Sequence, residues 1–230
     1  MHEPSVKAGN APAKLKSILV SNVMDFVFEH LDAWRDSKRE PCVAESKLNE
    51  QLCVHLSYKA RNDGLFLFHH EQSQAGQRRI DIAAKPASAA ILACGYESMH
   101  DSITVFEAKR LPASTKARRD EYVTGCTATS GGIQRFRLCL HGQEHDTAGM
   151  IGYVQKDGFE SVHSHINSSF ARITGCTDGL EWTQDDSLNP LEIDKICGKA
   201  RTESAHSRCD GTTIRLHHLW IDMNLGQPHE

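Results

Sequence analysis

The chain has 230 residues, of which 39% are hydrophobic and 24% charged, and its formal net charge at pH 7 is −4. These values are ordinary for a globular domain, and they exclude a protein that binds nucleic acid through its overall charge. No run reaches the roughly 18 apolar residues of a membrane helix, and no secretory signal stands at the start, so we expect a cytoplasmic protein with no membrane partner.

Cysteine and histidine are both frequent in this sequence. The eight cysteines include no C-x-x-C pair, which favours free thiols over disulfides in an intracellular chain. Fourteen histidines include two adjacent pairs, but no set of four ligands has the spacing of a structural zinc site. We therefore interpret the histidines as scattered surface or core residues, and a histidine-rich zinc protein remains an alternative.

The N-terminal part predicts two helices after a short lead-in. Residues 1–16 are rich in Ala, Pro, Gly and Lys and are expected to be a flexible lead-in to a single domain over residues 17–230. Apolar residues recur at helical spacing from Ser17 to Trp34, which predicts an amphipathic helix. A second helix is expected over 43–58.

One glutamate stands out in the second helix. Leu48, Leu52 and Leu56 form its apolar stripe, and Glu45, three residues before Leu48, lies on the same side. A carboxylate on an inward face is costly unless it has a partner such as a metal ion. Glu45 is therefore a candidate functional residue.

Two β-like segments carry charges where apolar residues are expected. The first, 78–84 (RRIDIAA), places Asp81 between two isoleucines, and the second, 102–111 (SITVFEAKRL), places Glu107 and Lys109 on one face. They share that face because side chains alternate along a strand. Two acidic and one basic side chain on apolar strands predict a site for a metal ion and a phosphate.

The remaining patterns complete a layered α/β domain. They predict a strand at 65–70, a helix at 133–140, a strand at 148–155, a helix at 159–173 and a last strand at 212–223. The order is then helix, helix, three strands, helix, strand, helix, strand. Such an order predicts an α/β fold with a mixed sheet between helices.

This order and these residues resemble the PD-(D/E)XK nuclease superfamily. The matching residues are Asp81, the E-x-K unit at 107–109, and Glu45 as the acid of the first helix; the likeness spans about residues 43–155. One departure is that Arg79-Ile80 stands where the superfamily's name-giving Pro would precede the Asp. The resemblance implies a three-layer α/β/α, restriction-endonuclease-like fold and a metal-dependent DNA endonuclease acting in restriction, repair or anti-phage defence.

The chemistry of such an enzyme assigns roles to these residues. Mg²⁺, with Mn²⁺ as a substitute, prefers oxygen ligands, which Asp81, Glu107 and the Ala108 carbonyl would supply. Glu45 would complete or support this ligand set. Lys109 would position the attacking water or stabilise negative charge at phosphorus.

A basic stretch follows the E-x-K strand and suggests a surface for nucleic acid, expected to be DNA. The candidate contact residues in it are Arg110, Lys116, Arg118 and Arg119. Gln134 and Arg135 are added because they resemble the polar residues that many members of the superfamily present from this helix toward the active site. A solvated basic loop explains the same charges. A homodimer, or a partner protein that supplies specificity, is also open.

Two alternatives keep the same residues without catalysis. In the first, the fold is that of a nucleic-acid-binding or assembly subunit. In the second, Glu107 and Lys109 form an ion pair on an edge strand while Asp81 caps a turn. A serine or cysteine nucleophile has little support, since there is no G-x-S-x-G motif.

Overall fold

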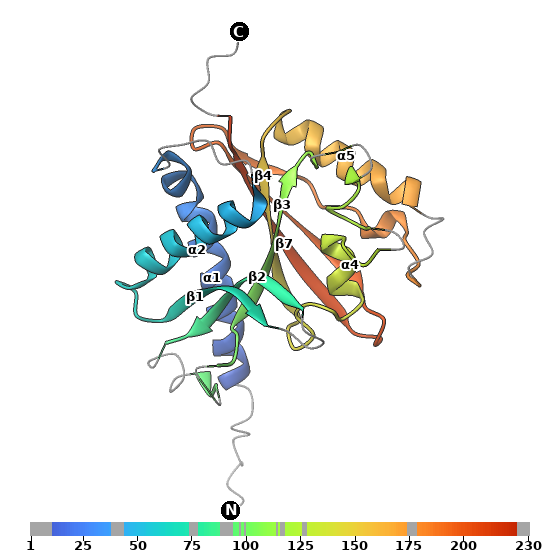
Figure 1. Ribbon diagram of the computed structural model, residues 1–230. Helices are drawn as coiled ribbons and strands as arrows, with labels where there is room; N and C mark the ends of the chain where they lie inside the picture. Colours follow the sequence, from blue (N-terminus) through green and yellow to red (C-terminus); the bar gives the residue numbers. More distant parts are fainter. Residues whose placement is uncertain are drawn as a thin grey trace, which may run out of the picture.

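The sheet of this protein is mixed and carries helices on both faces (Figure 1). The computed structural model describes residues 11–37, 44–73, 78–87, 94–96, 98, 100–113, 115, 118–125, 128–173 and 179–224. Within them, seven strands form one sheet in the order β1-β2-β3-β4-β7-β6-β5. Their bounds are β1 Phe66–Ser73, β2 Arg79–Pro86, β3 Thr104–Leu111, β4 Thr147–Val154, β5 Glu192–Asp194, β6 Lys199–Ser207 and β7 Thr213–Asp222.

The type of strand pairing changes twice across the sheet, from antiparallel to parallel and back. β1, β2 and β3 pair antiparallel, β3, β4 and β7 run parallel, and β6 and β5 return antiparallel beside β7. β4 lies at the centre, and all its residues after Thr147 are buried, as expected for a strand covered on both faces. β3 is its neighbour and is almost as buried, so its Glu107 and Lys109 lie deep in the fold.

Helices cover the two faces separately. α1 (Ala11–Asp36) and α2 (Glu45–Ala60) lie on one side of the sheet, and α4 (Gly132–Arg137) and α5 (Phe159–Arg172) lie on the other (Figure 1). Alternate residues of β3 divide between the two cores: Phe106 joins the core under α1 and α2, whereas Val105 joins the core under α4 and α5. This alternation follows from the period of two in a strand.

Most predicted elements are confirmed, with shifted ends. α1 begins at Ala11, so residues 11–16, expected in the lead-in, are helical; residues 1–10 lie outside the described part. The helix expected at 133–140 is shorter and ends at Arg137. In the part of the chain that the structure describes, no helix is long and apolar enough to cross a membrane.

The sequence reading missed β5 and β6. The buried side of β6 carries Thr202, Ser204 and His206, so its inward residues are polar and give no apolar alternation. A strand of this kind is stable only if its buried polar groups are hydrogen-bonded. The fold provides those partners.

A chain of hydrogen bonds joins β6 to β7 and to the segment before α4. Tyr122 Oη lies 2.7 Å from His218 Nδ1, and His218 Nε2 lies 2.8 Å from Ser204 Oγ. Ser204 Oγ in turn lies 2.7 Å from His206 Nε2, and His206 Nδ1 lies 3.0 Å from Asp186 Oδ1. Asp186 belongs to the short 3₁₀ helix η4 (Gln184–Asp186).

One proton arrangement satisfies every member of this chain. Because Trp220 Nε1 donates to Tyr122 Oη at 3.0 Å, the tyrosine hydroxyl is free to donate to His218. Each later group then accepts on one side and donates on the other, and the last donor, His206, reaches the Asp186 carboxylate. Both histidines are neutral in this arrangement. The serine and histidine beside Asp186 are fully buried, so they form a structural network and not a nucleophilic triad.

The buried histidines predict acid sensitivity of the fold. Burial lowers the pKa of His218 well below 6.5 and, despite Asp186, also lowers that of His206. The unfolded chain therefore binds more protons than the native one below about pH 6.5, and stability should fall by up to about 1.4 kcal/mol per pH unit for each histidine. Thermal unfolding of the Asp81→Asn variant, which lacks the opposing titration of Asp81, should show a decreasing midpoint from pH 8 to pH 5. A midpoint that stays constant over this range would contradict neutral His206 and His218.

Candidate functional site

Asp81 lies where β2 and β3 separate. The two strands pair from Ala84 opposite Thr104 to Ile82 opposite Phe106, and the ladder stops there. At the next residue of β2, Asp81, a side chain replaces the backbone pairing: Asp81 Oδ2 accepts a hydrogen bond of 2.8 Å from the Ala108 N–H of β3. A carboxylate is thus inserted between two central strands.

Glu107 is held by three basic side chains. Its Oε1 lies 2.6 Å from Arg135 Nη1 and 2.9 Å from Lys109 Nζ, and its Oε2 lies 3.0 Å from His141 Nδ1. Burial by itself would raise the pKa of Glu107, whose side chain is 1% exposed, but Lys109, His141 and Arg135 outweigh it and lower the pKa to about 2. Glu107 is therefore ionised at neutral pH.

Glu45 brings α2 to the same place. It is the first residue of that helix, and its Oε1 lies 3.3 Å from Lys109 Nζ while its Oε2 accepts a hydrogen bond of 3.0 Å from the Arg110 N–H. Burial opposes the charge of Lys109, but Glu107, Glu45 and Asp81 together raise its pKa above the usual value. Lys109 is thus a fixed cation between two carboxylates.

Asp81 differs from the other acids because its negative charge is poorly compensated. Burial and, after it, the charge of Glu107 raise the pKa of Asp81 from 3.8 to about 7, although Lys109 and the Ala108 hydrogen bond oppose this. The cluster therefore has a carboxylate whose ionisation would be favoured by one further cation.

The structure brings together the four residues that the sequence reading selected as catalytic. Asp81, Glu107, Lys109 and Glu45 come from β2, β3 and α2 and interact electrostatically with one another. The Glu107–Lys109 ion pair of the non-catalytic alternative is also present, but on a central strand of the sheet and not at its edge. Asp81 caps no turn, since its partner is the Ala108 N–H.

The basic residues proposed to contact nucleic acid differ in exposure and in ion-pair partners. Arg118 and Arg119 are exposed, but they pair with Glu121 at 2.6 Å and Asp120 at 3.4 Å. Lys116 lies outside the described residues. These acidic neighbours reduce the local positive charge that the sequence suggested.

The structure corrects the prediction made for Gln134 from the sequence. It was expected to face nucleic acid, but it is fully buried, and its Oε1 accepts hydrogen bonds from the N–H groups of Gly125 and Gly131. Its role in this structure is to hold the loop before α4. The next residue, Arg135, is the one that reaches the acidic cluster.

Sequence reasoning missed His141 as a member of the site. Its ring is 1% exposed and lies against Glu107, four residues after the end of α4. No local pattern marks it, because His141 reaches β3 only through the docking of α4 on the sheet. It was counted among the scattered histidines.

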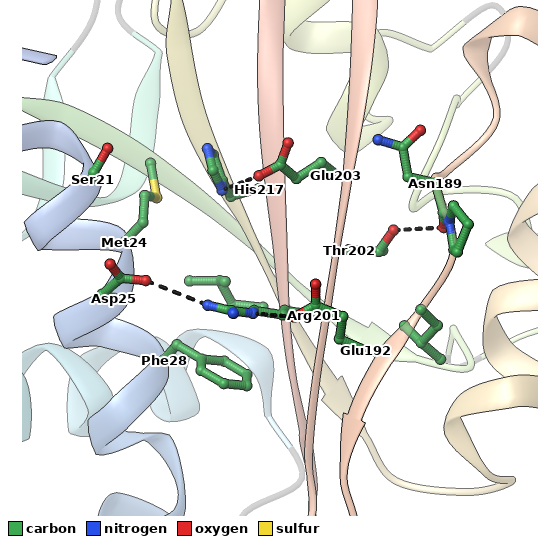
Figure 2. A pocket seen from close by; sticks show the side chains of 13 residues that line it. Ser21, Met24, Asp25, Phe28, Asn189, Glu192, Arg201, Thr202, Glu203 and His217 are labelled. Atoms are coloured by element: carbon green, nitrogen blue, oxygen red, sulfur yellow. Dashed lines mark hydrogen bonds and ion pairs between the residues drawn. The ribbon is translucent and has the colours of Figure 1, made fainter.

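A cavity of about 600 Å³ lies elsewhere, between α1 and the strands β5 to β7. Figure 2 shows that its charged groups satisfy one another: Arg201 contacts Asp25 and Glu192, and His217 faces Glu203. Its lining contains no residue of the acidic cluster. Next to the cluster lies only a small space of about 10 Å³, whose lining includes Glu45, Lys109, Arg110 and Arg118 but neither Asp81 nor Glu107.

The described residues contain no group of three or more His, Cys, Asp or Glu side chains that could hold a metal ion as they now stand. This holds for the acidic cluster and for the histidines considered as zinc ligands. Comparisons with protein-family models, with curated proteins and with solved structures gave no match for this chain. The case for a function therefore rests on the geometry of the cluster.

Proposed function

We propose that the protein is a metal-dependent nuclease that hydrolyses phosphodiester bonds, and that its substrate is DNA cut internally. The observation that carries this proposal is the convergence of Asp81, Glu107, Lys109 and Glu45 at the point where β2 and β3 separate. The order α2, β1, β2, β3, α4, β4 supports the resemblance to the restriction-endonuclease-like fold. That resemblance implies restriction, repair or anti-phage defence as the setting.

The residues fit a divalent cation in donor type and in charge. Asp81, Glu107 and Glu45 offer carboxylate oxygens, which Mg²⁺ prefers. Burial and the charge of Glu107 raise the pKa of Asp81, and a cation beside it would offset both effects. Asp81 and Glu107 would hold the ion, with the Ala108 carbonyl and Glu45 as further donors. A bound Mg²⁺ would neutralise charge on the phosphate and lower the pKa of its water.

Lys109 is suited to act on the reacting phosphate. Two carboxylates fix its ammonium group and keep it protonated, beside the small space that Arg110 and Arg118 also line. A fixed ammonium at this place would orient the attacking water or stabilise the negative charge that develops at phosphorus. Glu45 would maintain the position of Lys109.

The shape of the site favours a polymer as substrate. Small phosphate esters are usually enclosed by a pocket, whereas the space beside Glu45 and Lys109 has room for about one water molecule. A nucleic-acid strand could lie across the surface here, with Arg110 and Arg118 on its phosphate backbone. This supports a nuclease over a small-molecule phosphatase.

A non-catalytic nucleic-acid-binding or assembly subunit with the same fold is the second candidate. The observation that favours it is the enclosure of Glu107 by Arg135, Lys109 and His141. If these contacts are permanent, a basic side chain stays against each oxygen of Glu107, although Oε2 accepts no hydrogen bond among the described residues. The two candidates therefore differ in whether Glu107 can be released.

Cleavage assays separate the candidates. Purified protein would be incubated with supercoiled plasmid, linear duplex, single-stranded DNA and RNA, in MgCl₂, in MnCl₂ and in EDTA. We expect nicking or linearisation of the plasmid that requires the divalent ion and is abolished by EDTA. Absence of cleavage in every combination, together with measurable DNA binding, would favour the subunit. Stoichiometric zinc that survives mild chelation would instead favour a zinc protein.

A further inference from the structure

We propose that Arg135 exchanges between Glu107 and a nucleic-acid phosphate, so that the metal ion and the nucleic acid each promote binding of the other. This inference rests on the proposed nuclease function and concerns the regulation of the same site. Arg135 is bound to Glu107, one of the carboxylates that would hold the metal ion.

Arg135 is the one basic partner of Glu107 with an appreciable exposed surface. Its side chain is 26% exposed, whereas those of Lys109 and His141 are 9% and 1% exposed. If Lys109 or His141 moved away from Glu107, its ammonium group or its imidazole ring would lose this partner and still have little contact with water. Arg135 can turn towards water at less cost, so it is the partner that can leave.

The contacts of Arg135 also allow such a movement. Besides the contact with Glu107, its Nε donates a hydrogen bond of 3.1 Å to the Thr129 carbonyl, on the loop before α4. The guanidinium can keep one of its edges near this loop and present the other to a new anion. A phosphate is a suitable anion, because a guanidinium binds it with two parallel hydrogen bonds.

A metal ion and Arg135 would compete for Glu107 Oε1, since the buried His141 lies against the other oxygen, Oε2. Mg²⁺ lies about 2.1 Å from its ligands, and Arg135 Nη1 lies 2.6 Å from Glu107 Oε1, so both cations on this oxygen would be in close contact. Without nucleic acid, a displaced Arg135 guanidinium loses Glu107, its one carboxylate partner among the described residues. With nucleic acid, it gains a phosphate. The metal ion should therefore bind weakly alone and tightly with the substrate.

This coupling can be measured without relying on catalysis. The free Mn²⁺ concentration, followed by electron paramagnetic resonance, gives the Mn²⁺ affinity with and without a duplex of phosphorothioate DNA that resists hydrolysis. A blank with duplex alone corrects for Mn²⁺ on the DNA. For the wild type we expect the duplex to raise Mn²⁺ affinity about tenfold, and Mn²⁺ to raise duplex affinity by the same factor.

The variant Arg135→Gln should remove the competition. We expect it to bind Mn²⁺ alone about tenfold more tightly than the wild type and to lose the effect of the duplex. Arg172→Gln is the matched control, since Arg172 also pairs with one carboxylate, Asp120, at 2.6 Å and is 34% exposed. It should bind Mn²⁺ like the wild type. Arg135→Lys, which keeps the charge but not the paired donors, should bind Mn²⁺ alone as weakly as the wild type and show reduced coupling.

The outcomes distinguish this proposal from the nuclease proposal. If the wild type binds Mn²⁺ and cleaves DNA but Arg135→Gln shows unchanged Mn²⁺ affinity and unchanged coupling, the exchange is overturned while the nuclease stands. If the wild type neither binds Mn²⁺ nor cleaves any substrate, the nuclease proposal fails and the exchange fails with it. Equal effects of Arg135→Gln and Arg172→Gln would also overturn the exchange.

The geometry independently points to a redox-modification site at Cys139 and Cys209. Their sulfur atoms lie 3.8 Å apart, and the Cys209 N–H donates to the Arg137 carbonyl at 2.9 Å, which keeps the end of α4 beside the turn between β6 and β7. Cys209 is exposed and Cys139 half-buried, so a small oxidant reaches the pair. A disulfide here needs only a small approach of the two sulfurs.

Oxidised glutathione is a suitable oxidant for this pair. Burial, with the nearby Asp210 and Cys209, raises the pKa of Cys139 to about 11, so the more exposed Cys209 would attack first. Its thiolate forms a mixed disulfide and releases one glutathione thiol. The sulfur of Cys139 then displaces the second glutathione, so that two protein thiols become one disulfide and one oxidised glutathione becomes two thiols.

Peptide mapping without reduction tests the pair. After treatment with oxidised glutathione we expect a cross-linked peptide containing Cys139 and Cys209, lighter by two hydrogens than the sum of the two reduced peptides, and reversal by dithiothreitol. Cys209→Ser should remove this species, and Cys197→Ser should leave it unchanged. A stable glutathione adduct on Cys209, or cross-links only between two molecules, would overturn the assignment.

Discussion

Replacing Asp81 with Asn should lower Mg²⁺-dependent DNA cleavage by about a hundredfold to a thousandfold without destabilising the protein. The amide oxygen of Asn can still accept the hydrogen bond from the Ala108 N–H, so the local structure is kept. The substitution removes the negative charge that would help to bind the proposed metal ion. Because the pKa of Asp81 is raised to about 7, the folded protein disfavours this charge, and the variant should be at least as stable as the wild type at pH 8.

Initial rates of plasmid nicking and thermal unfolding in EDTA are the measurements for Asp81→Asn. Asp25→Asn is the control, because Asp25 is exposed and lies in the separate cavity of Figure 2. It should cleave at the wild-type rate. Cleavage by Asp81→Asn at the wild-type rate would show that Asp81 has no part in the reaction.

Glu107→Gln provides a contrast within the same cluster. We expect a similar loss of cleavage, but here with a decrease of about 3 kcal/mol in the free energy of unfolding. The ionised Glu107 neutralises Lys109 and Arg135, and a neutral amide would leave these cations without their central carboxylate. Equal activity losses with opposite stability effects would separate a catalytic role from a packing defect.

Asp186→Ala should reduce the free energy of unfolding by about 3–5 kcal/mol, the largest effect on stability that we expect. Asp186 Oδ1 lies 3.2 Å from Arg137 Nη1 and 3.0 Å from His206 Nδ1, and all three side chains are buried. Alanine would leave the guanidinium without its carboxylate and the histidine N–H without an acceptor. The whole hydrogen-bonded chain between η4 and β7 would lose its end point.

Urea unfolding of Asp186→Ala gives this free energy. Glu50→Ala removes an exposed carboxylate that pairs only with the exposed Lys47, and it should leave the unfolding midpoint nearly unchanged. A decrease below about 1 kcal/mol for Asp186→Ala would mean that Arg137 does not depend on this carboxylate. The present hydrogen bonds of Arg137 to the Ser207 and Glu181 carbonyls and its stacking 4.4 Å from the ring centroid of Trp182 would then be enough to hold the guanidinium.

The residues of the candidate site were recognisable because they break the pattern around them. Asp81 and Glu107 interrupt apolar strands, and Glu45 interrupts an apolar helix stripe. Such interruptions are costly in a buried element, so they mark positions where the fold needs a charge. The structure places all three with Lys109 in one cluster.

The partners of Glu107 could not be recognised in this way. Arg135 lies on a short helix whose pattern does not distinguish it from Arg137, and His141 follows in a loop. Their roles depend on how α4 docks on the sheet. The same docking buries Gln134, which the sequence suggested as a surface residue.

The amino-acid sequence by itself determined the order of most elements, the two apolar cores and the four charges that meet between β2, β3 and α2. Periodicity carries this information, because each element must bury one face. Only the tertiary structure decided the short strand β5, the strand β6 with its mostly polar buried side chains, and the contacts of Arg135 and His141 with Glu107. Those features depend on hydrogen bonds and ion pairs between segments far apart in the chain, which leave no local pattern.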